Sequence, residues 1–166
     1  ALRLAKLVTG RHEVVAFAQS WHGVTGGAAG STDAFGRRGY GPMGVGTFAI
    51  PAPDLLRGPF RSASGYDWRA ELDYAFDLVD RQSSGSLAAF IAEPVQGAGG
   101  VIIPPATYWP EIQRIVDQYG ILLISDGVIC AFGRLGHWFA YEKFGYRPDL
   151  ITFAKGVTSG YIPLGG

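Results

Sequence analysis

The sequence predicts an α/β fold with three layers, in which helices cover both faces of a mostly parallel sheet. Short apolar runs that resemble strands alternate along the chain with segments whose apolar residues recur every three to four positions, as in amphipathic helices. Of the 166 residues, 48% are hydrophobic and 13% are aromatic, which is enough for a buried core. Glycine-rich stretches at 23–46 and 96–100 directly follow strand-like runs, and we expect them to be site loops.

In the first half of the chain, residues 1–8 are expected to form a helix that ends at Gly10, and residues 13–18 an apolar strand. Asp67 has a side chain suited to capping the N-terminus of a second helix. The apolar residues of that helix recur at i, i+4 and i+7, which predicts one buried stripe. The stripe consists of Leu72, Phe76 and Val79.

In the second half, a strand is expected at 87–92 and a helix at about 108–119, which Gly120 would end. Two further apolar runs, 121–125 and 150–153, have the length and composition of buried strands. Repeated strand-helix-strand units of this kind favour parallel pairing of the strands.

Charge and composition argue against several functional classes. The formal net charge is zero, with 14 basic and 14 acidic residues, so neither nucleic acid nor an anionic membrane is expected as a partner. No apolar run reaches the roughly 18 residues of a membrane-spanning helix, and we expect a cytoplasmic protein. The single cysteine, Cys130, fits a reducing compartment. His12, His22 and His137 lie far apart in the sequence, so no metal site is expected.

Two charged residues stand at the ends of buried-looking strands. Lys155 follows the run 150–153 and is itself followed by small residues, whereas Asp126 ends the run that begins at Ile121. Open α/β sheets build their sites at such strand ends. A lysine held in a dry pocket loses part of its preference for the ammonium form, and the neutral amine can then attack an aldehyde. This pattern favours a Schiff-base lysine with an accompanying carboxylate.

Four segments, in order along the chain, carry a resemblance to a known family. Residues 125–134 and 152–161 resemble the two signature stretches of the class III aminotransferases, which use pyridoxal phosphate. Residues 20–23, Ser-Trp-His-Gly, resemble the aromatic-His-Gly element of that family, and residues 92–97 resemble its Glu-Pro element. The resemblance implies part of the large domain of a fold type I enzyme, with pyridoxal 5'-phosphate as the cofactor.

The resemblance also implies roles for individual residues. Asp126 would keep the ring nitrogen of the cofactor protonated, and Lys155 would form the Schiff base and move a proton between the substrate and the cofactor. Trp21 would stack on one face of the ring and Val128 on the other. His22, next to Trp21, would belong to the same cofactor site.

Other residues would support the substrate side. Glu93 is expected to pair with an arginine that also receives the substrate carboxylate, because a buried unpaired glutamate is costly. Gln96 and Ile129 would line the pocket. Gly127 stands where the family normally has a glutamate, which removes a charge and adds backbone freedom beside Asp126. Either the site is impaired or another group compensates.

Three functions are compatible with these patterns. The first is transamination between an amino donor and a 2-oxo acid acceptor. The second is decarboxylation coupled to transamination, because the first half is similar to the dialkylglycine decarboxylase branch whereas the second half is closer to the omega-amino-acid:pyruvate branch. The third is a catalytically inactive fragment or assembly domain.

The resemblance places residues 1–166 within the large domain of a longer enzyme. The phosphate-binding turn and the C-terminal small domain are expected to be absent from the chain. The full-length protein is expected to be a homodimer or a higher homo-oligomer, since fold type I enzymes build their sites at a dimer interface.

Overall fold

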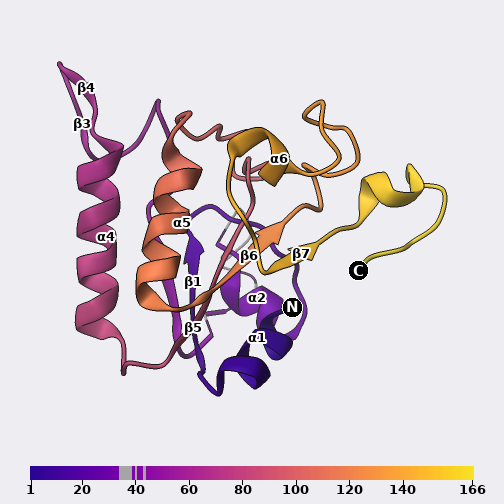
Figure 1. The fold of residues 1–166 in the computed structure, drawn as a ribbon, viewed down its shortest axis with the longest axis horizontal. Coiled ribbons are helices and arrows are strands. Elements are labelled where there is room, and N and C mark those ends of the chain that lie inside the picture. The colour runs from indigo at the N-terminus through magenta and orange to yellow at the C-terminus, as the bar shows by residue number, and fades with distance from the viewer. Residues whose placement is uncertain (34–38, 40, 43) are drawn as a thin grey trace.

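A parallel sheet forms the centre of the computed structural model, which describes residues 1–33, 39, 41–42 and 44–166. Among the described residues this sheet has five strands in the order β2-β1-β5-β6-β7 (Figure 1). All four strand pairs are parallel, as the sequence predicts. The strands are β1 (Glu13–Phe17), β2 (Thr47–Ile50), β5 (Leu87–Ala92), β6 (Leu122–Asp126) and β7 (Leu150–Thr152).

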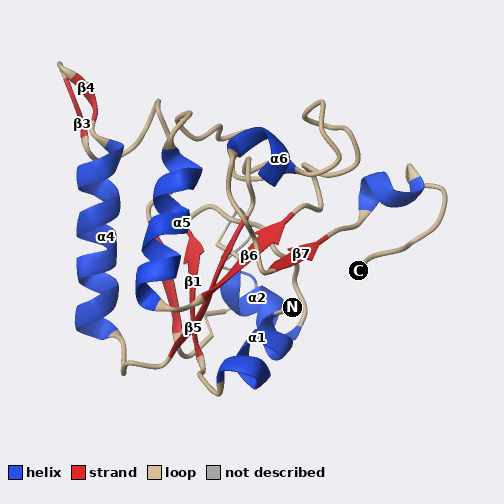
Figure 2. Ribbon diagram, viewed as in Figure 1, coloured by secondary structure: helices blue, strands red, loops and turns tan. Residues whose placement is uncertain are grey.

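Helices cover both faces of the sheet, which confirms the three-layer α/β fold (Figure 2). The helices α4 (Trp68–Gln82) and α5 (Tyr108–Tyr119) pack on one face, and α1 (Leu2–Thr9) packs on the other beside α2 (Gly26–Ser31). The remaining elements are the short hairpin β3 (Arg61–Ser62) and β4 (Gly65–Tyr66), the helix α6 (Ala140–Phe144) and the 3-10 helix η1 (Lys155–Thr158).

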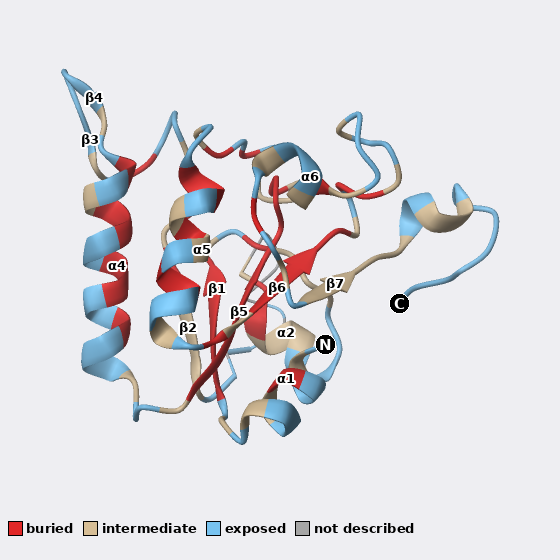
Figure 3. Ribbon diagram, viewed as in Figure 1, coloured by how far each residue is buried: buried red, intermediate tan, exposed pale blue. Residues whose placement is uncertain are grey.

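Alternate residues of the central strands point to opposite faces of the sheet, so each strand contributes side chains to the apolar core on both faces. Val15, Phe17 and Phe90 pack under α4 and α5, whereas Val14 and Ala89 pack under α1. Every residue of β5 is buried, which explains its continuous apolar sequence. Figure 3 shows the same pattern, with buried strands and helices that are buried on one side only.

Local signals in the sequence fix several helix ends. The Asp67 side chain accepts a hydrogen bond from the backbone N–H of Ala70, so this aspartate is the N-cap of α4. Gly10 and Gly120 end α1 and α5 in the left-handed conformation, with φ of 67° and 59°. The predicted stripe of α4 is buried as expected: Leu72, Phe76 and Val79.

Glu13 fastens the start of β1 to the turn that precedes β5. Its carboxylate accepts hydrogen bonds from the Oγ of Ser83 at 2.6 Å, from the N–H and Oγ of Ser84, both at 2.9 Å, and from the N–H of Ser86 at 3.1 Å. Burial disfavours its charge, but these donors together hold the pKa of Glu13 below its usual value. This anchor lies at the end of the sheet opposite the site described below.

The order of the strands reverses at β1, because the strands that follow it in the sequence lie on opposite sides of it. From β1 the chain continues to β2 on one side, and after α4 it returns to β5 on the other side of β1. In open parallel sheets the crevice at such a switch, beyond the carboxyl ends of the strands, is the usual place for a ligand.

Candidate active site

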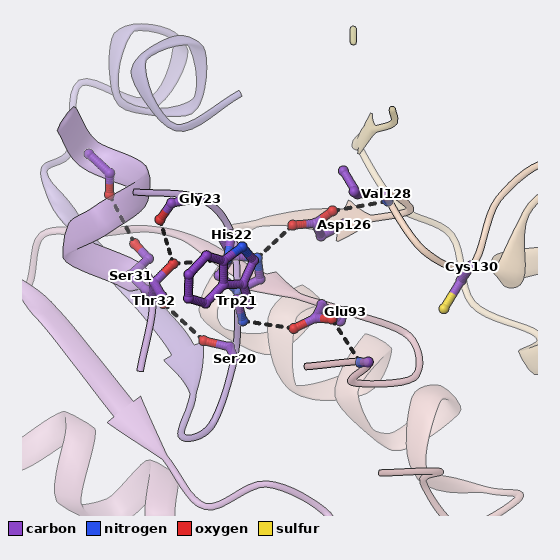
Figure 4. Close-up of polar contacts among 12 residues, drawn as sticks. Ser20, Trp21, His22, Gly23, Ser31, Thr32, Glu93, Asp126, Val128 and Cys130 are labelled. Carbon is purple, nitrogen blue, oxygen red and sulfur yellow. Dashed lines mark hydrogen bonds and ion pairs between the residues drawn. The ribbon is translucent and has the colours of Figure 1, made fainter. Parts of the chain in front are cut away.

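The loops that follow β1, β5 and β6 bring four predicted site residues together (Figure 4). Trp21 and His22 lie on the loop after β1, Glu93 directly follows β5, and Asp126 is the last residue of β6. Their positions follow from the parallel strand order, because the carboxyl ends of all three strands meet at one edge of the sheet.

Asp126 is buried and is held by two donors. It is 4% exposed, its Oδ2 lies 2.7 Å from Nδ1 of His22, and its Oδ1 accepts the backbone N–H of Val128 at 3.1 Å. Among the described residues no lysine or arginine forms an ion pair with this carboxylate. Asp126 therefore keeps acceptor capacity for a cationic or N–H donor that enters the site.

The environment of His22 indicates its tautomer. Its side chain is 1% exposed, and Nε2 is buried and has no hydrogen-bond partner among the described residues. Because an ionised carboxylate can only accept, Nδ1 carries the proton that is donated to Asp126. The backbone N–H of His22 donates to the Oγ1 of Thr32 at 2.9 Å, and that hydroxyl donates to the carbonyl of Gly23 at 2.8 Å.

Glu93 is also buried, at 4% exposure, and its carboxylate accepts two backbone N–H groups. Its Oε1 accepts the backbone N–H of Trp21 at 2.8 Å, and its Oε2 accepts the backbone N–H of Gly97 at 3.0 Å. No arginine in the described ranges forms an ion pair with it. Burial raises the pKa of Glu93 above its usual value, although the two N–H donors act in the opposite direction.

A cavity of about 300 Å³ lies beside the Asp126 carboxylate. His22, Asp126 and Val128 contribute to its wall, together with Thr152 and residues of α1 and α2. Five other predicted site residues are not part of that wall: Trp21, Glu93, Gln96, Ile129 and Lys155. Trp21 is half-buried next to His22, and Ile129 is 38% exposed.

Lys155 corrects one expectation from the sequence. It was expected in a dry pocket, but the structure places it exposed at the start of η1, with φ of 45°. The chain leaves the sheet immediately after β7, and the segment from η1 onward is exposed or half-buried (Figure 3). Thr152, three residues earlier, does reach the cavity, so β7 directs this segment toward the site without burying the lysine.

Gln96 has a structural place rather than a lining one. It is 1% exposed, its Nε2 donates to the carbonyl of Ala18 at 2.9 Å, and its backbone pairs with Ile102 in both directions. Its Oε1 is buried and has no hydrogen-bond partner in the described part of the chain. Gln96 thus closes the loop after β5 onto the end of β1.

Two contributors were not identified from the sequence. Thr32 holds the backbone of His22 and Gly23, and Thr152 forms part of the cavity wall. Thr152 precedes Lys155 inside a recognised segment, so its position could have indicated its role. Thr32 lies in a glycine-rich stretch without periodicity, where the sequence has no comparable signal.

Cys130 is a buried residue of the loop that follows β6. It is 2% exposed, and its thiol donates to the carbonyl of Val95 at 3.5 Å. Burial raises its pKa to about 11. The cysteine therefore packs as a small apolar side chain.

In the described part of the chain, no helix combines the length and the apolar character needed to cross a bilayer. No group of three or more histidine, cysteine, aspartate or glutamate residues there is arranged to hold a metal ion.

Comparison with known proteins gives a consistent assignment. An uncharacterised aminotransferase of Schizosaccharomyces pombe is 47% identical over 161 residues, which are 96% of this chain and 36% of the relative. The putrescine–pyruvate aminotransferase of Pseudomonas aeruginosa is 43% identical over 155 residues, or 88% of this chain and 33% of the relative. The chain thus spans about a third of the length of these curated relatives.

Solved structures agree. An (S)-enantioselective omega-transaminase from Thermomicrobium roseum superposes with a TM-score of 0.84 at 38% identity, covering 99% of this chain and 38% of the other. The taurine:2-oxoglutarate aminotransferase of Bifidobacterium kashiwanohense gives a TM-score of 0.87 at 34% identity, with the same coverage of 99% and 38%. The family model of class III aminotransferases matches residues 1–166, and the chain belongs to that family.

Proposed function

We propose that this protein is a pyridoxal-phosphate-dependent aminotransferase that moves an amino group from an amine or amino acid to a 2-oxo acid. The observation that carries the proposal is the buried Asp126 carboxylate, which His22 and Val128 hold beside a cavity without a cationic partner among the described residues. In a class III aminotransferase such a carboxylate suits a protonated ring nitrogen.

The residues at the site fit this cofactor. A buried carboxylate that lacks a cation is costly in isolation, and a protonated pyridine nitrogen would compensate it. The cavity of about 300 Å³ is lined by Asp126 on one side and by residues of α1 and α2 on the other. Two of the structures similar to this chain are described as containing the cofactor: an amine transaminase from an uncultivated Pseudomonas and the Bifidobacterium enzyme.

When bound, pyridoxal phosphate supplies an aldehyde that takes up the amino group and a ring that withdraws electrons. Asp126 would keep a proton on the ring nitrogen, and His22 would hold the Asp126 carboxylate in place. The indole of Trp21 would bind the ring by stacking. Lys155 is the residue that would hold the cofactor, and its Nζ would accept and return the proton at the reacting carbon.

The relatives support the substrate class more than any single substrate. The Pseudomonas relative is named for the donor putrescine, and the Thermomicrobium structure is named only as an omega-transaminase. A taurine–pyruvate aminotransferase of Bilophila wadsworthia is 37% identical over 150 residues. No specific observation favours the decarboxylase alternative, so it is not proposed as a second function.

The wider context is part of the same proposal. Residues 1–166 would form part of the cofactor-binding large domain of a cytoplasmic enzyme that is a homodimer or a higher homo-oligomer.

The proposal is tested with the full-length protein and a panel of donors. Adding pyridoxal phosphate should produce the long-wavelength absorbance of a lysine-bound cofactor. Mixing the loaded protein with pyruvate and putrescine, taurine or 4-aminobutyrate should then yield alanine. A protein that binds the cofactor but forms no alanine from any donor would contradict transamination, and a protein without the absorbance change would contradict the cofactor assignment.

A further inference from the structure

We propose that Glu93 is a positioning residue that holds the loop of Trp21 against the loop after β5, and through it the stacking surface for the cofactor. The link to a cofactor rests on the proposed function, whereas the contact between the two loops does not. The contacts that carry the inference involve the backbone of the two loops.

The first observation is the way the two carboxylate oxygens of Glu93 diverge. One accepts the backbone N–H of Trp21 at 2.8 Å, 72 residues away along the chain, and the other accepts the backbone N–H of Gly97 at 3.0 Å. Only a carboxylate offers two acceptor oxygens in this arrangement, because an amide side chain replaces one of them with a donor. Glu93 thus joins the loops that leave β1 and β5.

The second observation is that hydrogen bonds and close packing hold the loop after β5 in place. The backbone of Gln96 pairs with Ile102 through two hydrogen bonds of 3.1 and 3.0 Å, and its side chain donates to the carbonyl of Ala18. Gly99 approaches Gln19 so closely that a Cβ on it would lie 2.5 Å from the Gln19 carbonyl oxygen. A carboxylate fixed to this loop therefore has a rigid reference for the position of Trp21.

The third observation concerns the strand end itself. Gln19 adopts φ of 64°, a left-handed conformation that a glutamine rarely takes, just before Ser20 and Trp21. This turn directs the chain that leaves β1 toward the loop after β5. The hydrogen bond from Trp21 to Glu93 lies two residues after this turn and holds the chain in that direction.

Comparison of matched variants tests the positioning role. Glu93→Gln keeps the shape and removes one acceptor, and Glu93→Asp keeps the charge but shortens the reach, so that one N–H loses its partner. Glu71→Gln is the control. Glu71 lies in the first turn of α4 and is equally buried, at 3% exposure, but its carboxylate accepts a hydrogen bond from the hydroxyl of Tyr66 in β4. Thermal unfolding checks that each variant folds.

Hydrogen exchange of the cofactor-free protein gives the first measurement. We expect the amide of Trp21 to exchange about tenfold faster in Glu93→Gln, as loss of a charge-assisted hydrogen bond implies, while Glu71→Gln leaves it unchanged. Unchanged exchange at Trp21 in both Glu93 variants would overturn the inference. This result does not depend on cofactor binding, so it remains decisive if the proposed function fails.

Cofactor titration in a double-mutant cycle gives the second. Glu93→Gln should raise the dissociation constant for pyridoxal phosphate about tenfold in the wild-type background. In a Trp21→Ala background the same change should raise it less than about threefold, because the stacking surface is already gone. Equal effects in both backgrounds would show that Glu93 acts independently of Trp21, which would overturn the inference and leave the proposed function intact.

Discussion

The imidazole of His22 and the carboxylate of Asp126 share a hydrogen bond of 2.7 Å across 104 residues of chain. Nδ1 of His22 donates to this buried carboxylate, so the imidazole holds the aspartate side chain in one orientation at the cavity wall. Arg3 of α1 lines the cavity beside this carboxylate, but no lysine or arginine among the described residues forms an ion pair with Asp126. The dyad is therefore suited to receive a protonated ring nitrogen.

Asp126→Asn should lower the transamination rate of the full-length enzyme by about two orders of magnitude or more, on the order of 3 kcal/mol of transition-state stabilisation. The amide keeps the shape of the side chain but lacks the charge that retains a proton on the ring nitrogen. Single-turnover absorbance measurements separate this step from cofactor binding. An unchanged rate would mean that another group holds the ring nitrogen.

Borohydride reduction in the presence of pyridoxal phosphate should attach the cofactor to Lys155. Peptide mass spectrometry locates the adduct, and Lys155→Arg, which keeps the charge but cannot form the link, should remove it. Because Lys155 is exposed in the present structure, equal labelling of Lys6 and Lys143 would indicate non-specific modification and contradict the assignment.

Gly127→Ala should destabilise the protein by about 1–3 kcal/mol, as overpacking does in a dense interior. A Cβ at this position would lie 3.0 Å from the carbonyl oxygen of Thr152 and 3.3 Å from the Cβ of Ala131. Gly127→Glu should cost at least as much. Urea unfolding measures the change.

The matched control for that position is Gly27→Ala in helix α2. Its added Cβ would make only an ordinary contact, 3.8 Å from Cδ1 of Leu2, and alanine favours a helix over glycine. We expect Gly27→Ala to be neutral or stabilising. If both variants lost the same stability, close packing of Gly127 against β7 would not be the cause.

Glu13→Gln should lower stability near neutral pH by about 2 kcal/mol, because an amide cannot accept all four hydrogen bonds at this anchor. The folded-state pKa of Glu13 lies below the usual value of 4.5 for a glutamate. Its contribution is thus present above about pH 4.5 and is lost as the pH falls through the folded-state value.

Unfolding curves from pH 3 to pH 8 should show wild type and Glu13→Gln converging toward the acidic end. Asp77→Asn is the control, since Asp77 forms an exposed pair with Arg81 and should matter little at any pH. A stability difference between wild type and Glu13→Gln that is independent of pH would show that the carboxylate charge is not involved.

The sequence predicted the central elements well where composition and termination signals agreed. The strand at 87–92 and the helix at 108–119 have the predicted bounds, because a fully buried parallel strand is continuously apolar and a left-handed glycine marks the helix end. The carboxyl-end position of Asp126 followed from the same reasoning.

Elements without such signals were missed. The helix α2 lies in a stretch of glycine and alanine that was expected to be a loop, and part of that stretch, at 34–38, 40 and 43, lies outside the described residues. The edge strand β2 and the five-residue helix α6 are too short for a periodic pattern. Their formation depends on contacts that are distant in sequence.

The site shows the same division. Motifs predicted that His22 and Asp126 belong together, whereas the backbone partners of Glu93 depend on the path of two loops and could not be inferred from residue types. The exposure of Lys155 was also unpredictable from its apolar neighbours, because burial after β7 depends on what packs over the segment.

The buried thiol of Cys130 has a practical consequence for spectroscopy. It is the only cysteine of the sequence, and with its pKa raised to about 11 it remains protonated and shielded at neutral pH. Maleimide dyes should therefore react at a cysteine placed at an exposed position such as Ser159 and leave Cys130 untouched. Movements of the segment after β7 could then be followed by fluorescence without removing the native cysteine.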